Sequence, residues 1–197
     1  MQGIHDYILE IKEPFKDTFK TASGVELYAN KRFSADRLSN RIGKVMATPL
    51  FFEGIIEVGY EVLVDASILY EQIYNGKVQE SIHLLDKDKM LFKIDPKLIV
   101  LYRENPQEQW KGFLDSILVE PIKKASKSLK SSLIIIPDEE IEFEKTKATV
   151  TICNSELSEF GIVKNDTIAI KPLGIPFWLD GKEFWWLKND DVLGRYE

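Results

Sequence analysis

The sequence has little of the residue types that build catalytic and metal sites. Its 197 residues include one cysteine, Cys153, and two histidines, His5 and His83. A single cysteine excludes an intrachain disulfide, and no Cys/His cluster has the spacing of a zinc site. Gly-rich phosphate loops and nucleophile elbows are also missing. We therefore expect no enzymatic activity, no cofactor and no bound metal.

Basic residues are in deficit, and long apolar runs are missing. Lys and Arg number 26 against 32 Asp and Glu, so the formal charge is −6. This balance argues against nucleic-acid binding, because no basic excess is present to neutralise phosphates. The longest aliphatic run, 133–136, ends at Pro137, far short of the ~20 residues that span a bilayer. We expect a cytoplasmic protein with neither a membrane nor a nucleic-acid partner.

Short alternating segments rich in β-branched residues dominate the chain. The clearest are 62–64, 82–85, 117–119, 150–152 and 167–170. Asn75-Gly76 and Asp180-Gly181 each lie between apolar stretches, which is typical of two-residue hairpin turns. Helical periodicity is restricted to 66–74 and 104–113. The pattern predicts an all-β chain.

The two sides of a polar segment resemble each other. Residues 6–10 align with 115–119 at an offset of 109, and 97–102 align with 191–196 at an offset of 94. Weak matches that keep a common order indicate an internal repeat of ~90 residues. We predict two copies of one unit, 1–103 and 113–197, joined by a linker, 104–112.

Each copy contains a polar, cationic stretch that leads into an aliphatic one. The aliphatic residues are Val25 and Leu27 in the first copy and Leu133, Ile134, Ile135 and Ile136 in the second. Composition alone favours the interpretation that each aliphatic run is an interior strand. The other interpretation is an exposed hook for a partner's groove, since contiguous exposed apolar residues mark interaction sites.

These features together resemble the chaperonin 10 (GroES) co-chaperonin family in a tandem form. The second copy is similar to the family's loop motif, pre-strand turn, last hairpin and closing motif at 132–138, 163–168, 179–184 and 189–194. The first copy is similar to it at 6–9, 23–27, 43–45 and 58–62. The tandem layout is similar to that of the double co-chaperonins of plastids.

The resemblance implies two tandem GroES-like irregular β-barrels whose loops bind the apical rim of a GroEL-type chaperonin, which itself binds the ATP. It assigns chaperonin binding to Val25, Leu27, Leu133, Ile134, Ile135 and Ile136. A homo-oligomeric ring is a further implication, although a tandem chain supplies barrels in pairs. Glu26 places a charge inside the first hook, so we expect that hook to be the weaker one.

Two other classes of function stay open. One is a degenerate adaptor or phage-type chaperonin modulator that forms no ring. Its support is that the family's roof hairpin would fall at 48–58 and 153–163, and both spans are short here. The other is an enzyme, because a GroES-like barrel also occurs in zinc alcohol dehydrogenases. The missing nucleotide fingerprint and zinc ligands argue against an enzyme.

Overall fold

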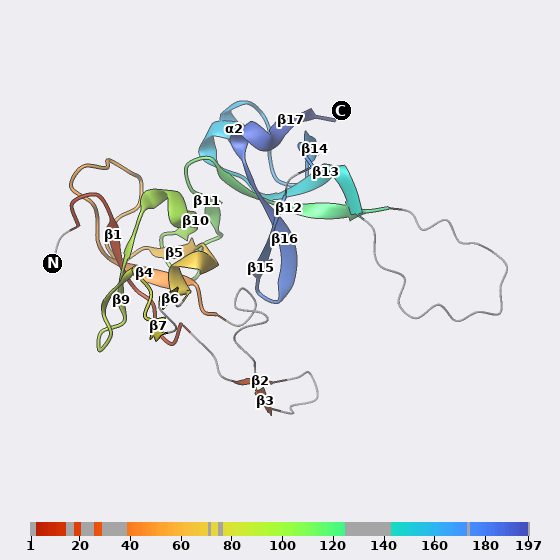
Figure 1. The fold of residues 1–197 in the computed structure, drawn as a ribbon. Coiled ribbons are helices and arrows are strands. Elements are labelled where there is room, and N and C mark those ends of the chain that lie inside the picture. Colours follow the sequence, from red (N-terminus) through yellow and green to blue (C-terminus); the bar gives the residue numbers. More distant parts are fainter. Residues whose placement is uncertain are drawn as a thin grey trace, which may run out of the picture. The chain divides into compact units, whose positions relative to one another are not determined.

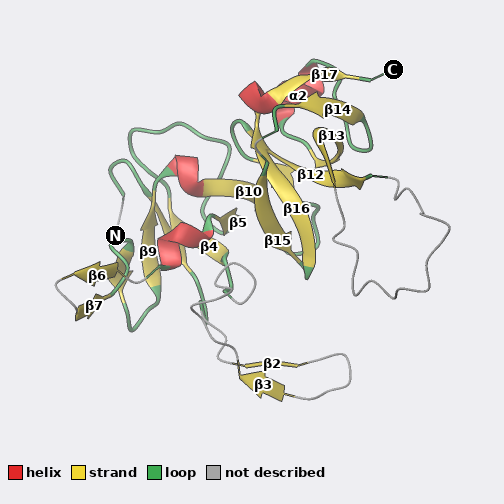
Figure 2. Ribbon diagram, turned by 45° about the vertical axis from the view of Figure 1, so that its right-hand side comes forward, coloured by secondary structure: helices red, strands yellow, loops and turns green. Residues whose placement is uncertain are grey.

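The computed structural model separates into two compact units, Met1–Leu114 and Asp115–Glu197. It describes residues 3–14, 18–20, 26–28, 39–70, 72–74, 77–124, 143–172 and 174–196, with the backbone alone for 18–20, 26–28, 72–74 and 77–79. Each unit is built on one antiparallel sheet (Figures 1 and 2). The predicted all-β class is confirmed.

The first unit has a seven-stranded sheet in the order β11-β10-β5-β4-β1-β9-β8. Its strands are β1 (Tyr7–Glu10), β4 (Ile42–Ala47), β5 (Glu61–Val64), β8 (Leu84–Asp86), β9 (Leu91–Ile94), β10 (Ile99–Arg103) and β11 (Lys111–Gly112). Two hairpins pair β2 (Thr18–Lys20) with β3 (Glu26–Tyr28) and β6 (Gln72–Tyr74) with β7 (Lys77–Gln79). The short 3-10 helices are η1 (Ala66–Leu69) and η2 (Pro96–Leu98).

The second unit has a six-stranded sheet in the order β15-β16-β12-β13-β14-β17. Its strands are β12 (Ser116–Lys123), β13 (Phe143–Ile152), β14 (Thr167–Ile170), β15 (Ile175–Leu179), β16 (Lys182–Lys188) and β17 (Val192–Arg195). A short α-helix of five residues, α2 (Ser155–Glu159), follows β13, and the 3-10 helix η3 (Asn189–Asp191) precedes β17. Figure 2 shows β12, β16 and β15 running side by side in this sheet.

The second sheet repeats the strand order of the first when it is read from the opposite edge. The first unit gives β10-β5-β4-β1-β9-β8, and the second gives β17-β14-β13-β12-β16-β15. Corresponding strands therefore have corresponding neighbours, and the internal repeat inferred from the sequence is present in the fold. Among the seven strands of the first sheet, only β11 at its edge lacks a counterpart among the described strands of the second sheet.

The turns that lead into β5 and β14 show this equivalence in detail. Gly59 has a φ of +96° and donates its N–H to the carbonyl of Val45 over 2.8 Å. Asn165 has a φ of +75° and donates its N–H to the carbonyl of Val150 over the same distance. Glycine and asparagine occupy this left-handed region at the lowest cost, so each copy uses a suitable residue for one turn.

The strand pairings correct the alignment of the two copies by one residue, both at the start and at the end of the repeat. The β1–β4 pairing shifts between Ile8 and Leu9, and the β12–β13 pairing shifts between Leu118 and Val119. The true offset here is therefore 110 residues, and the pairings of β10 and β17 likewise give 93. The offset of 109 aligned Asp6 with Asp115. An alignment that is wrong by one residue matches side chains on one face of a strand with side chains on the other face of its counterpart, because side chains alternate along a strand.

The segment 66–74 is not the helix that its periodicity predicted. It begins as the 3-10 helix η1, in which the carboxylate of Asp65 accepts the N–H of Ser67 over 2.8 Å, and it continues into β6. The hairpin predicted at Asn75-Gly76 is confirmed, because β6 pairs with β7 on either side of it. The Asn-Gly turn determined the local structure, and the helical periodicity of 66–74 did not, because a hairpin pairs backbone groups that a short isolated helix leaves unpaired.

The segment 104–112 belongs to the first unit, and 104–113 is not a helix. Its last two residues form β11, which pairs with β10. The next residue, Phe113, is buried in the first core and donates its N–H to the carbonyl of Val100 over 3.0 Å. The boundary between the units follows Leu114, whereas the sequence placed the start of the second copy at 113.

Each unit has a core of its own, to which the strands of its sheet contribute buried side chains. In β4, Val45 and Ala47 are buried while Lys44 and Met46 are exposed, which is the alternation of a strand covered on one face. The pairing leaves each sheet with two edge strands. Closure of the sheets into barrels, and with it the likeness to the GroES fold, therefore stays a prediction.

We predict that Gly59→Ala lowers the free energy of unfolding of the first unit by about 1–2 kcal/mol, because a Cβ is strained in the left-handed region. Asn165→Gly is the matched control at the equivalent turn of the second copy, and we expect it to change stability by less than about 1 kcal/mol. Urea denaturation followed by circular dichroism measures both. Equal losses in the two variants would contradict the equivalence of these turns.

Candidate functional site

Most of the residues assigned to chaperonin binding lie outside the described part of the chain. These are Val25, Leu133, Ile134, Ile135 and Ile136. Leu27 lies in β3, where its backbone pairs with that of Phe19, and its side chain is not described. The binding role of these six residues stays a prediction, and the described residues next to them define where each segment is attached.

In the first unit, the segment that carries Val25 and Leu27 leaves the end of β1 and returns into β4. Its two ends are joined at Asn40, whose N–H donates to the carbonyl of Pro14 over 2.9 Å. The Asn40 side chain also donates to the carbonyl of Lys12 over 2.7 Å and accepts the N–H of Ile42 over 3.1 Å. One asparagine therefore holds the start and the end of this segment together.

In the second unit, the segment that carries the aliphatic run leaves the end of β12 and returns into β13. Its ends are joined by strand pairing, which extends to Lys123 opposite Phe143. Because β1 corresponds to β12 and β4 to β13, both aliphatic segments occupy the same place in the repeat. The two segments are therefore attached at equivalent positions of the repeat, the first through Asn40 and the second through strand pairing.

Reactive side chains in the described residues are engaged in structural contacts. The Sγ of Cys153, half-buried, donates to the carbonyl of Ile162 over 3.3 Å, and Nδ1 of His83 lies 3.2 Å from the carbonyl of Lys93. His83 lies in the turn before β8 rather than within the predicted strand 82–85. No group of three His, Cys, Asp or Glu that could hold a metal occurs in the described residues.

The first unit has a pocket of about 320 Å³. Tyr7, Phe52, Gly54, Ile56 and the acidic residue Glu57 are among the residues that line it. Tyr7 is fully buried, and its hydroxyl has no hydrogen-bond partner among the described residues. Desolvation raises the pKa of this hydroxyl to about 12. It stays protonated at neutral pH, and so it does not provide a general base.

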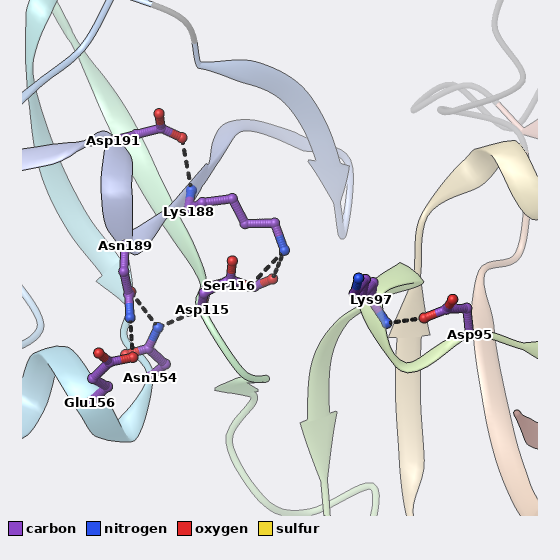
Figure 3. A network of polar contacts seen from close by, with 9 residues as sticks. All are labelled: Asp95, Lys97, Asp115, Ser116, Asn154, Glu156, Lys188, Asn189 and Asp191. Atoms are coloured by element: carbon purple, nitrogen blue, oxygen red, sulfur yellow. Dashed lines mark hydrogen bonds and ion pairs between the residues drawn. The ribbon is translucent and has the colours of Figure 1, made fainter. Parts of the chain in front are cut away.

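A polar network in the second unit joins the start of β12, helix α2 and helix η3 (Figure 3). Asn154, almost fully buried, accepts the N–H of Leu157 over 2.9 Å and donates to Oδ1 of Asn189 over 2.7 Å. Asn189 in turn donates to Glu156 over 2.6 Å. Because the buried groups of Asn154 are paired, the network holds these three segments in one arrangement.

Lys188 forms the other half of this network. Its Nζ lies 2.8 Å from Oδ1 of Asp115 and 3.0 Å from Oγ of Ser116, and its backbone N–H donates to Asp191 over 3.1 Å. In the first unit, Asp95 provides a simpler cap for the corresponding helix η2 (Figure 3). The network is structural: it ties the start of β12 to α2, to the end of β16 and to η3.

Sequence reasoning missed the network, although one signal was available. An asparagine followed by Ser-Glu-Leu is an N-cap pattern, since its side chain can accept an N–H from the first turn of a helix. The partner Asn189 lies 35 residues away and gives no local signal. The pairings of β12 with β13 on one side and with β16 on the other bring the two asparagines together.

No protein-family model matches this sequence, and no curated protein matches it. No helix among the described residues is long and apolar enough to cross a membrane. The repeated fold and the position of the two aliphatic segments are therefore the basis for the functional proposal.

We predict that Asn154→Ala lowers the free energy of unfolding of the second unit by about 2–3 kcal/mol, since it removes the helix cap and leaves a buried amide partner unpaired. Ser155→Ala, at the neighbouring exposed position, is the control and is expected to cost less than about 1 kcal/mol. Urea denaturation measures both variants. A loss in Asn154→Ala no larger than in the control would contradict the structural role of the network.

We predict that Tyr7→Phe leaves stability at pH 7 unchanged or raised, because the hydroxyl that it removes has no described partner. Above pH 10 the unfolded chain ionises Tyr7 while the folded chain keeps it protonated up to a pKa of about 12. Wild-type stability therefore falls between pH 10 and 12 more steeply than that of Tyr7→Phe. Parallel stability curves in this range would contradict the shift.

Proposed function

We propose that this protein is a cytoplasmic co-chaperonin that binds the apical rim of a GroEL-type chaperonin and assists ATP-dependent protein folding. The chaperonin binds the ATP, and this chain contributes binding rather than catalysis. The hook residues are Val25 and Leu27 in the first copy and Leu133, Ile134, Ile135 and Ile136 in the second.

One observation carries the proposal. The two aliphatic segments occur at the same place in two copies of one strand order, each between the first strand of its unit and the strand that pairs with it. Leu27 lies in β3, and β3 pairs with β2 in a two-stranded sheet of its own rather than with a strand of the seven-stranded sheet. The position supports the interpretation of the segments as loops attached to a sheet.

The physics of such a hook favours many weak contacts over one strong contact. In an extended segment, residues i and i+2 point the same way, so Ile134 and Ile136 offer two side chains to one groove. Burial of one aliphatic side chain gives about 1.5–3 kcal/mol, against about 1–2 kcal/mol per residue for ordering the backbone. Several such loops on one assembly bind tightly through effective concentration. They also release together when the partner changes state.

A second candidate is an adaptor of the same type that forms no ring. The observation in its favour is that the described spans 48–58 and 153–163 contain no hairpin, and the second contains α2 instead. A cap that encloses a cavity needs a roof, whereas an adaptor does not. The mass of the complex separates the two candidates, because only a ring adds several chains symmetrically to one chaperonin end.

The proposal is tested by co-elution with the GroEL-type ring of the source cell, with ATP, with ADP and without nucleotide. The test variant is Ile134→Asp/Ile136→Asp, and we expect it to bind at least about tenfold more weakly, because each carboxylate replaces about 1.5–3 kcal/mol of aliphatic burial. The wild type should bind in a nucleotide-dependent manner.

The matched control is Ser131→Asp/Ser132→Asp, which adds the same charge to the same segment next to the hook. We expect it to retain nucleotide-dependent binding. The first hook is tested by Val25→Asp/Leu27→Asp, with a smaller expected loss because Glu26 already carries a charge there. Absence of wild-type binding under every nucleotide condition would refute the co-chaperonin proposal, and equal loss in the serine control would refute the hook assignment.

A further inference from the structure

The connection between β4 and β5 lines the pocket of the first unit. Residues 48–58 contain no helix or strand, and most of them, together with Tyr7 of β1, surround its volume of about 320 Å³. Small-molecule sites have volumes of about 300–1,000 Å³ and largely apolar walls with a few polar groups. The volume of this pocket therefore suits a small molecule rather than a peptide.

The hydroxyl of Tyr7 is a buried polar group that the fold itself does not require. Tyr7 is 0 % exposed, and its Oη has no hydrogen-bond partner among the described residues. A buried hydroxyl without a partner lowers stability. The corrected offset of 110 places Ile117 at the equivalent position of the second copy, and Ile117 is buried as completely. An apolar side chain thus fills this position in one copy, and the hydroxyl is particular to the other.

Gly54 lies against this hydroxyl. A Cβ at position 54 would lie 2.8 Å from Oη of Tyr7 and 2.7 Å from Cε1 of Phe52. Tyr7, Phe52 and Gly54 all line the pocket, so the hydroxyl lies at the wall that Gly54 forms. Any side chain at position 54 would press on the hydroxyl and on the phenyl ring, and glycine avoids both contacts.

The charge of the pocket favours a cation. Among the described residues that line it, the charged ones are Glu53 and Glu57, and both are exposed. Two carboxylates attract a cation and repel an anion. Phe52, Ile56 and Val58 supply apolar wall, and the face of an aromatic ring also attracts cations. An amphipathic cation matches both kinds of wall.

We propose that this pocket binds a small primary amine in its protonated form, with an ammonium group that donates a hydrogen bond to Oη of Tyr7. Glu53 and Glu57 balance the charge of the ammonium group, and the apolar part of the amine contacts the side chains of Phe52 and Ile56. Burial raises the pKa of Tyr7 to about 12, so the hydroxyl is neutral at pH 7 and its oxygen is available as an acceptor.

The inference does not rest on the proposed chaperonin binding. None of the hook residues is among the described residues that line the pocket. We therefore expect Ile134→Asp/Ile136→Asp to bind the amine as the wild type does. Failure of amine binding would leave the hook proposal standing, and the reverse also holds.

The first test is isothermal titration calorimetry of the full chain at pH 7 in about 0.15 M salt, with 2-phenylethylammonium as the ligand. Three analogues serve as controls: 2-phenylethanol has no charge, 3-phenylpropionate has the opposite charge, and 2-phenylethyltrimethylammonium has no N–H donor. We expect the amine to bind at least about tenfold more tightly than each of them. Equal binding of the alcohol, or no binding of the amine at about 10 mM, would overturn the proposal.

The second test repeats the titration with variants of the wall. We expect Tyr7→Phe to bind the amine at least about tenfold more weakly, because it loses an acceptor for a charged donor. Gly54→Ala should weaken binding as well, since its Cβ presses on the hydroxyl. Glu57→Gln should weaken binding about twofold to fivefold, because this carboxylate is exposed to solvent.

Asp88→Asn is the matched control for Glu57→Gln. It removes the same charge from an exposed turn before β9, beside the opposite end of β1, where Glu10 pairs with Leu91. We expect it to bind the amine as the wild type does, and circular dichroism shows that each variant is folded. Wild-type affinity in Tyr7→Phe would overturn the proposal. An equal loss in Asp88→Asn and Glu57→Gln would overturn the assigned role of the carboxylates.

Discussion

Each unit depends on one central strand, β1 or β12, that is hydrogen-bonded along both edges and buried. β1 pairs with β4 and β9, and β12 pairs with β13 and β16. In each unit, the first of these neighbours (β4 or β13) comes early in the chain, and the second (β9 or β16) comes late in it. The chain must therefore leave the central strand, turn back beside it, and return much later on its other side, which places a connecting segment at the same point of both copies.

This constraint links the fold to the proposed function. The connecting segment begins where the central strand ends, and its two ends meet at Asn40 in the first copy and at Lys123 and Phe143 in the second. Hydrogen bonds of Asn40 hold the ends in the first copy, and strand pairing holds them in the second. The aliphatic residues of both segments fall in this part of the repeat, where binding elements are commonly found on a rigid scaffold.

Duplication of the unit within one chain makes the two copies unequal at their ends. The edge of β10 is covered by residues that already belong to the approach to β12, and the edge of β17 meets no such residues among those described. The polar network around Asn154 and Lys188 strengthens the second unit near β12 and η3. The first sheet is thus extended by the residues that lead into the second unit, whereas β17 is the last described strand at the equivalent edge of the second sheet.

The sequence by itself determined the all-β class, the presence of a repeat and the hairpin at Asp180-Gly181, where both residues have positive φ. These features depend on local alternation and on turn residues, which a single strand or turn expresses without its neighbours. The tertiary structure decided three features: the strand register, the burial of Phe113 in the first core and the role of Asn154. The register corrected the alignment of the two copies by one residue. Each of these depends on pairing and burial between segments distant in the chain, and a local pattern carries no information about which distant segment will pair or which face will be covered.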